Sequence, residues 1–195
     1  LPQSLPETNT LGVGYRGVQS AWINRNVMGS PKSKVIVQVW IDFLASNYKD
    51  FSVSIVDKII KDYVVTGKAR IEIHYFPLPQ NAPWAQKGAI AVECAADQGA
   101  FWPFYDEIVK NLVSLGESSF VPGQLDMIAN SLGLNEEKFH SCIQKDNTSP
   151  IDASVQQGLV LGLNRVPTVV VNGKMFNKPF DYVSIQSFIE EELSQ

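Results

Sequence analysis

Residues 35–43, VIVQVWIDF, form a nearly unbroken apolar run that is rich in β-branched side chains. Such a run is typical of a central strand that is buried on both faces of a sheet. The next segment, 47–66, has apolar residues at helical spacing, and Gly67 follows it as a helix-ending signal. Residues 69–78 alternate and then become apolar, which predicts a second strand. This order predicts a right-handed β-α-β unit.

The remainder of the chain is expected to be a helical region followed by a hairpin. Residues 81–163 contain several segments with helical patterns, with Asn81 and Asn135 at expected N-caps. An Asn-Gly pair between two apolar runs in residues 166–176 indicates a β-hairpin. Residues 181–193 predict a terminal helix that begins at an Asp cap. Strands thus resume after the helices, which argues for an insertion within one fold.

Four segments are therefore expected along the chain. The segments are an N-terminal tail with a short strand (1–25), the first part of an α/β core (26–80), an inserted helical subdomain (81–163), and the second part of the core (164–195). Within the first two segments, a short strand is expected near residues 17–23 and a turn is expected at residues 28–34.

Composition limits the classes of partner. The chain has 195 residues and a formal net charge of −4, with a pI near 5.2. Nucleic acids and anionic membrane surfaces require a basic footprint, so neither is expected as a partner. No apolar run reaches the roughly 20 residues of a membrane-spanning helix, so no membrane span is expected.

No cofactor or metal ion is expected from the sequence. The chain has two histidines, His74 and His140, and they are not clustered with cysteine or carboxylate residues at the spacing of a metal site. His74 lies in a strand pattern and is expected to be a packed sheet residue.

The two cysteines, Cys94 and Cys142, do not form a C-x-x-C motif. An even and sparse cysteine count fits one structural disulfide bond in an oxidising compartment. Two buried free thiols in a cytosolic protein are the alternative that the count leaves open.

Three segments in a fixed order carry a family resemblance. The first has a turn, a strand and Asp-Phe, the second has a strand that ends in Phe-Pro-Leu before helices, and the third has Val-Pro before a strand that ends in Asn-Gly-Lys. They read GSPKSKVIVQVWIDF, YFPLPQNAPWAQKGAIAVECAADQGAFWPFYDEI and GLNRVPTVVVNGKMF. Together they resemble the DsbA-like thioredoxin-fold proteins over residues 26–193.

This resemblance implies an α/β architecture, a thioredoxin fold with a large inserted helical subdomain. It also implies that the Val166–Pro167 peptide bond is cis and lies beside the start of the first long helix. An extracytoplasmic location, as a secreted, periplasmic or cell-surface anchored protein, follows from the family and from the cysteine usage. Thiol oxidation by a C-x-x-C pair is the usual activity of the family.

The sequence departs from this family at its reactive residues. The four positions that align with C-x-x-C are Ala45, Ser46, Asn47 and Tyr48. The buried glutamate that family members often carry below the site aligns with Val39. Thiol exchange requires a thiolate, and an alanine methyl group or a phenol cannot form a disulfide bond. The motif is therefore degenerate, and no catalytic residue is assigned to it.

A redox-inactive module that binds an extended peptide or protein partner is the function that this pattern favours. In the family, the backbone before the cis-proline pairs with an extended chain, a form of β-augmentation. Residues 45–48 together with Val166 and Pro167 are the expected surface. Trp84, Trp102 and Phe104 either extend this surface or belong to the helical core.

Three alternatives involve an enzyme. Some DsbA-fold proteins resemble kappa-class glutathione transferases, in which a serine near the helix start stabilises a glutathione thiolate, and a glutathione-dependent enzyme is the first alternative. The aligned position here is Ala45. Ser46 is one residue late and is instead expected as a helix N-cap. A thiol oxidoreductase whose cysteine at position 45 was changed to alanine is the second alternative. Residual thiol chemistry at Cys94 and Cys142 is the third, and a structural disulfide is preferred to it.

Overall fold

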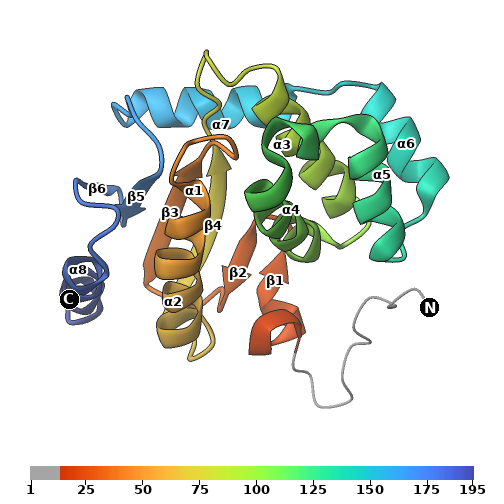
Figure 1. Cartoon of the computed structure of the whole chain (residues 1–195). Coiled ribbons are helices and arrows are strands. Elements are labelled where there is room, and N and C mark those ends of the chain that lie inside the picture. The colour runs from red at the N-terminus through yellow and green to blue at the C-terminus, as the bar shows by residue number, and fades with distance from the viewer. Residues whose placement is uncertain (1–13) are drawn as a thin grey trace.

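The structure is a computed structural model, and it describes residues 14–195, apart from the side chains of residues 112–114. The expected N-terminal tail lies, through residue 13, outside the described residues. The described part forms a sheet with helices on both of its faces (Figure 1).

A six-stranded mixed sheet with the order β1-β2-β4-β3-β5-β6 organises the fold. The strands are β1 (Ile23–Asn24), β2 (Val27–Gly29), β3 (Val35–Ile41), β4 (Ala69–Tyr75), β5 (Thr168–Val171) and β6 (Lys174–Phe176). The apolar run predicted as a central strand is β3, which lies between β4, its parallel neighbour, and β5, its antiparallel neighbour. The Asn-Gly hairpin is the β5–β6 turn.

The N-terminal expectations were wrong in detail. Residues 17–23 do not form one strand, because the 3₁₀ helices η1 (Tyr15–Gly17) and η2 (Ser20–Trp22) precede β1. Arg16 and Gly17 have positive φ angles, 56° and 79°, which an extended strand does not allow. The expected turn at 28–34 begins later, because residues 28 and 29 pair with β4 as part of β2.

A continuous helix follows β3 from Tyr48 to Val64. It consists of α1 (Tyr48–Phe51), the π-helical turn η3 (Ser52–Val56), α2 (Asp57–Ile59) and the π-helical turn η4 (Ile60–Val64). Gly67 follows with a φ of 75°, which agrees with its predicted role in ending the helix.

Six helical segments separate β4 from β5, as the pattern predicted. They are α3 (Trp84–Ala96), α4 (Phe101–Leu115), η5 (Gly116–Phe120), α5 (Pro122–Ser131), α6 (Glu136–Gln144) and α7 (Ser149–Val160), and α8 (Tyr182–Leu193) ends the chain. Helices α3 to α6 gather at one side of the sheet, whereas α7 returns across it (Figure 1). Asn135 and Asp181 cap α6 and α8 as expected. Asn81 does not cap α3, which begins at Trp84.

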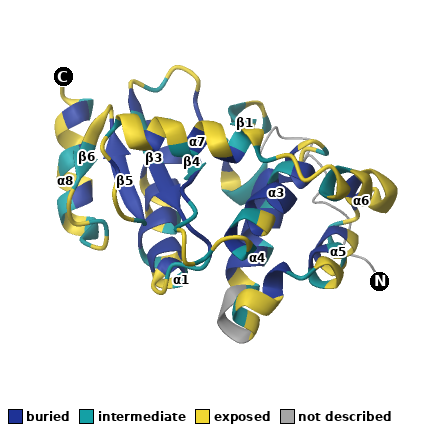
Figure 2. Ribbon diagram, turned by 90° about the horizontal axis from the view of Figure 1, so that it is seen from above, coloured by how far each residue is buried: buried dark blue, intermediate teal, exposed yellow. Residues whose placement is uncertain are grey.

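The sheet buries a different apolar cluster on each face, so its central strands β3 and β5 are largely buried, whereas the outer strands β1 and β6 are not (Figure 2). On one face Val37, Val39 and Ile71 pack with the helix that follows β3. On the other face Trp40 packs with Phe76 on the side of α7. Burial on both faces explains why β3 is almost continuously apolar in sequence. His74 stacks on Trp40 with ring centroids 4.4 Å apart, which confirms it as a packed sheet residue.

A disulfide bond joins Cys94 on α3 to Cys142 on α6, with 5.7 Å between the two Cα atoms. This confirms the expected bridge between two inserted helices. Because these are the only cysteines in the sequence, the alternative of two free thiols is wrong and neither sulfur is a free thiol in this state.

Candidate functional site

The aligned redox positions and the Val-Pro step lie at the same edge of the sheet. Trp40 near the end of β3 pairs with Thr168 at the start of the antiparallel strand β5. The chain segments that leave β3 and enter β5 therefore meet at this edge, which we call the β3–β5 edge. The Val166–Pro167 peptide bond is cis, and so is Ala82–Pro83.

A buried carboxylate, Asp42, fixes two loops at this edge. Its side chain is 1% exposed. One oxygen accepts a hydrogen bond from the backbone N–H of Leu44 at 2.8 Å. The other accepts from the N–H of Leu78 at 2.9 Å and from Nδ2 of Asn81 at 2.7 Å. Asp42 thus ties the turn after β3 to the loop after β4, which a pattern of local residues does not reveal.

The segment aligned with C-x-x-C is a turn followed by the helix start. The N–H of Ala45 donates to the carbonyl of Asp42 at 3.0 Å, and the N–H of Tyr48 donates to the carbonyl of Ala45 at 2.9 Å. The helix begins at Tyr48 with Asn47 at its N-cap. The expectation that Ser46 caps the helix was wrong, because the turn extends one residue further before helical geometry begins.

Tyr48 is a core residue, although it occupies the position of the resolving cysteine. Its side chain is 1% exposed, and its hydroxyl group is hydrogen-bonded to that of Tyr105 on α4. Its ring packs edge-on against Phe43, with centroids 5.8 Å apart. The expected contribution of the Tyr48 side chain to a binding surface was therefore wrong. Ala45 is half-buried, and Ser46 and Asn47 are exposed.

The two tyrosines remain neutral phenols in this environment. Burial raises the pKa of Tyr48 well above its ordinary value, and burial also raises the pKa of Tyr105 to about 12. The Ser52 hydroxyl lies 3.3 Å from the Tyr105 hydroxyl and completes a small buried polar group. A neutral, hydrogen-bonded phenol is neither a nucleophile nor a general base at neutral pH.

Position 39 also lacks a group that could transfer protons. Val39 is fully buried and pairs with Ile73 on β4 and Val169 on β5. The strand below the turn is therefore apolar at this point, in agreement with the alignment.

The three aromatic residues on the helical side have separate positions. Trp102 and Phe104 are buried core residues of α4, and Phe104 packs on Phe139 with centroids 5.3 Å apart. Their suggested place on a binding surface was wrong, because both face the interior of the helical region. Trp84 is half-buried, and the ammonium group of Lys87 lies 4.8 Å from its ring centroid.

The chain resembles known proteins along most of its length. A family model described as thioredoxin matches residues 23–191. Disulfide bond formation protein D of Bacillus subtilis is 25% identical over 179 residues, which cover 86% of this chain and 76% of the relative.

Solved structures share the fold. The oxidised BdbD of Bacillus subtilis matches with a TM-score of 0.80 at 22% identity, over 88% of this chain and 94% of that one. DsbA of Chlamydia trachomatis matches with a TM-score of 0.75 at 18% identity, over 85% and 90% of the two chains.

These matches confirm the expected fold class, a thioredoxin-type sheet with an inserted helical region. Among the helices of residues 14–195, none is long and apolar enough to cross a bilayer. The chain therefore belongs to the thioredoxin family, as a protein with the DsbA-like fold that carries Ala45 and Tyr48 at the positions of the paired cysteines.

Proposed function

We propose that this protein binds an extended peptide or protein segment at the β3–β5 edge and performs no thiol–disulfide exchange there. The observation that carries the proposal is the state of the two aligned positions. Position 45 has no reactive group, and position 48 holds a tyrosine that is buried in the core and bonded to Tyr105. Both cysteines of the chain are bonded to each other between α3 and α6. Exchange requires a free, accessible thiolate.

The β3–β5 edge has the features of a site at which an extended chain can pair with the backbone. Val166 lies outside β5, and its backbone N–H and C=O make no hydrogen bond within the part of the chain that the structure describes. These groups are available to pair with an extended chain. Leu44, Ala45 and Leu78 are half-buried apolar residues of the two loops that Asp42 ties together. They supply apolar contacts for the side chains of a bound segment.

The same proposal includes location and domain organisation. The Bacillus subtilis relative is a disulfide bond formation protein, and a structural disulfide suits an oxidising compartment, so we place the chain outside the cytoplasm. We take residues 81–163 as an insertion into a core of residues 26–80 and 164–195. The net charge of −4 favours a polypeptide partner over nucleic acid.

A matched pair of variants tests the binding edge. Reduced and carboxamidomethylated ribonuclease A serves as an unfolded probe without thiols, and its binding is measured by fluorescence anisotropy. Val166→Lys places a charge at the edge and should weaken binding by about tenfold or more. Val65→Lys is the control, because Val65 is 38% exposed and follows the helix at the opposite end of the sheet. Equal affinities for the two variants, or no binding by the wild type, would contradict the proposal.

A further inference from the structure

The net negative charge of the chain lies in its inserted helices, because they have few basic residues. Residues 81–163 hold ten of the 20 acidic residues but four of the 16 basic residues. The other residues of the chain therefore carry a small excess of positive charge. An uneven distribution of this kind attracts a partner of opposite charge to one part of the surface.

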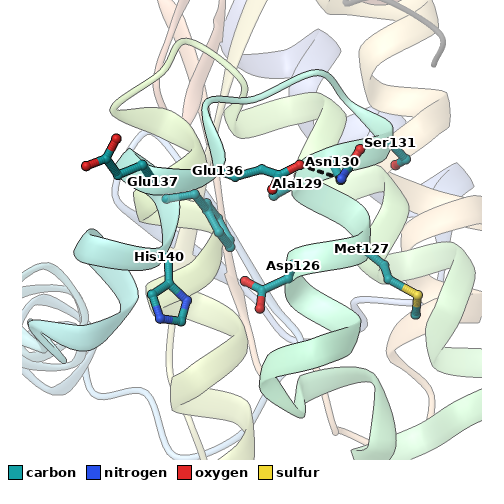
Figure 3. Close-up of a pocket in the computed structure, with 9 residues that line it drawn as sticks. Asp126, Met127, Ala129, Asn130, Ser131, Glu136, Glu137 and His140 are labelled. Atoms are coloured by element: carbon teal, nitrogen blue, oxygen red, sulfur yellow. Dashed lines mark hydrogen bonds between the residues drawn. The ribbon is translucent and has the colours of Figure 1, made fainter.

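A groove between α5 and α6 combines this charge with an apolar floor. Its volume is about 650 Å³. Ala129 and Phe139 form buried parts of its wall, and Met127, which is 56% exposed, adds apolar surface. Asp126 from α5 and His140 from α6 point into the space between the two helices (Figure 3).

The carboxylates at this groove are not neutralised. The side-chain carboxylate of Asp126 makes no hydrogen bond or ion pair with any residue that the structure describes, and the same holds for the carboxylate of Glu137. Glu136 accepts one hydrogen bond, from the side chain of Asn130 (Figure 3). No lysine or arginine is among the described residues that line the groove.

We propose that this groove is a second docking surface, which takes a lysine or arginine side chain from a basic segment of a partner polypeptide. The aliphatic stem of such a side chain packs on apolar surface while its charged end stays in a polar environment. Met127 provides exposed apolar surface at the groove, and Asp126 and Glu136 provide the opposite charge.

Two observations favour a polypeptide over a simple ion. In the described part of the chain, no group of three histidine, cysteine or carboxylate residues is arranged to hold a metal ion. A bare cation would also leave the exposed side chain of Met127 uncovered. The α5–α6 groove is separate from the β3–β5 edge. The proposal of docking at the groove can therefore fail while the proposal of binding at the β3–β5 edge stands, and the reverse also holds.

The test is a titration of the full ¹⁵N-labelled chain with a short capped peptide in which lysines alternate with pairs of alanines. At about 0.1 M salt, where long-range attraction is screened, the amide signals of Asn130, Phe139 and His140 should shift. The double variant Asp126→Asn, Glu136→Gln should bind at least about fivefold more weakly. The control variant Glu117→Gln, Glu191→Gln has the same change in charge at two exposed positions elsewhere and should bind as the wild type does.

Three results would overturn the proposal. Equal weakening in both double variants would show that the peptide senses only the overall charge. Equal shifts at these amides with spermine, at the same affinity, would show a site for small cations instead of polypeptide side chains. A peptide with glutamate in place of lysine should give no shifts at these amides, so shifts of the same size would exclude charge complementarity.

Discussion

Replacing Tyr48 with cysteine restores half of the missing thiol pair, and it should strongly destabilise the fold. The side chain is 1% exposed and packs against Phe43 and Tyr105. Removing a buried aromatic ring of this size costs about 3–5 kcal/mol, because the cavity that remains collapses only partly. Tyr48→Phe removes only the hydroxyl group. Since Tyr105 keeps Ser52 as a neighbour at 3.3 Å, that change should cost about 1 kcal/mol.

Urea unfolding at neutral pH, followed by intrinsic fluorescence, measures these differences. Ala45→Cys is the matched control, because position 45 is half-buried and gains only one sulfur atom; it should change the free energy of unfolding by less than about 0.5 kcal/mol. The slope against urea should be the same for all variants. A Tyr48→Cys variant within about 1 kcal/mol of the wild type would refute the assignment of Tyr48 to the core.

Three further changes test other parts of the structure by the same unfolding measurement. Asp42→Ala leaves two partly buried backbone N–H groups without their acceptor and should cost roughly 3 kcal/mol; a loss below about 1 kcal/mol would contradict the role of Asp42. Replacing Cys94 and Cys142 with alanine opens a loop with a sequence separation of 48, which should cost at most about 4 kcal/mol on a chain-entropy basis; an unchanged midpoint would exclude a stabilising bridge. A hydrogen bond from His74 lowers the pKa of Glu72, so the stability that this carboxylate contributes is present at neutral pH and is lost as the pH falls through its lowered pKa. Glu72→Gln should therefore lose less stability than the wild type between about pH 6 and about pH 3, and parallel losses would contradict the pairing.

The central elements of the fold could be predicted because their sequence signals are local. The apolar run of β3, the Asn-Gly turn of the hairpin and the Asn135 cap each depend on residues a few positions apart. Residues 17–23 were not predictable in this way. The backbone turns at Arg16 and Gly17, where this segment begins, and the Arg16 side chain reaches Asp57 and Asp106 in distant helices.

The candidate site could be predicted only at the level of its backbone. The order of motifs indicated where the β3–β5 edge would lie, and it showed which reactive residues are missing. It did not indicate that Tyr48 turns inward, because its partner Tyr105 is 57 positions away. Asn81 is a similar case, since its side chain bonds to Asp42 across 39 positions instead of capping the nearby helix. Contacts of this kind arise from packing and leave no periodic pattern in the sequence.

Oxidation of a reduced substrate tests the central claim most directly. A model peptide with two cysteines is incubated with oxidised glutathione as the oxidant, with and without this protein, and disulfide formation is followed by mass spectrometry. The absence of a thiol at positions 45 and 48, with both cysteines held in the α3–α6 disulfide, predicts equal rates in the two reactions. A rate that rises in proportion to the concentration of the protein would contradict the claim that this DsbA-like protein is redox-inactive.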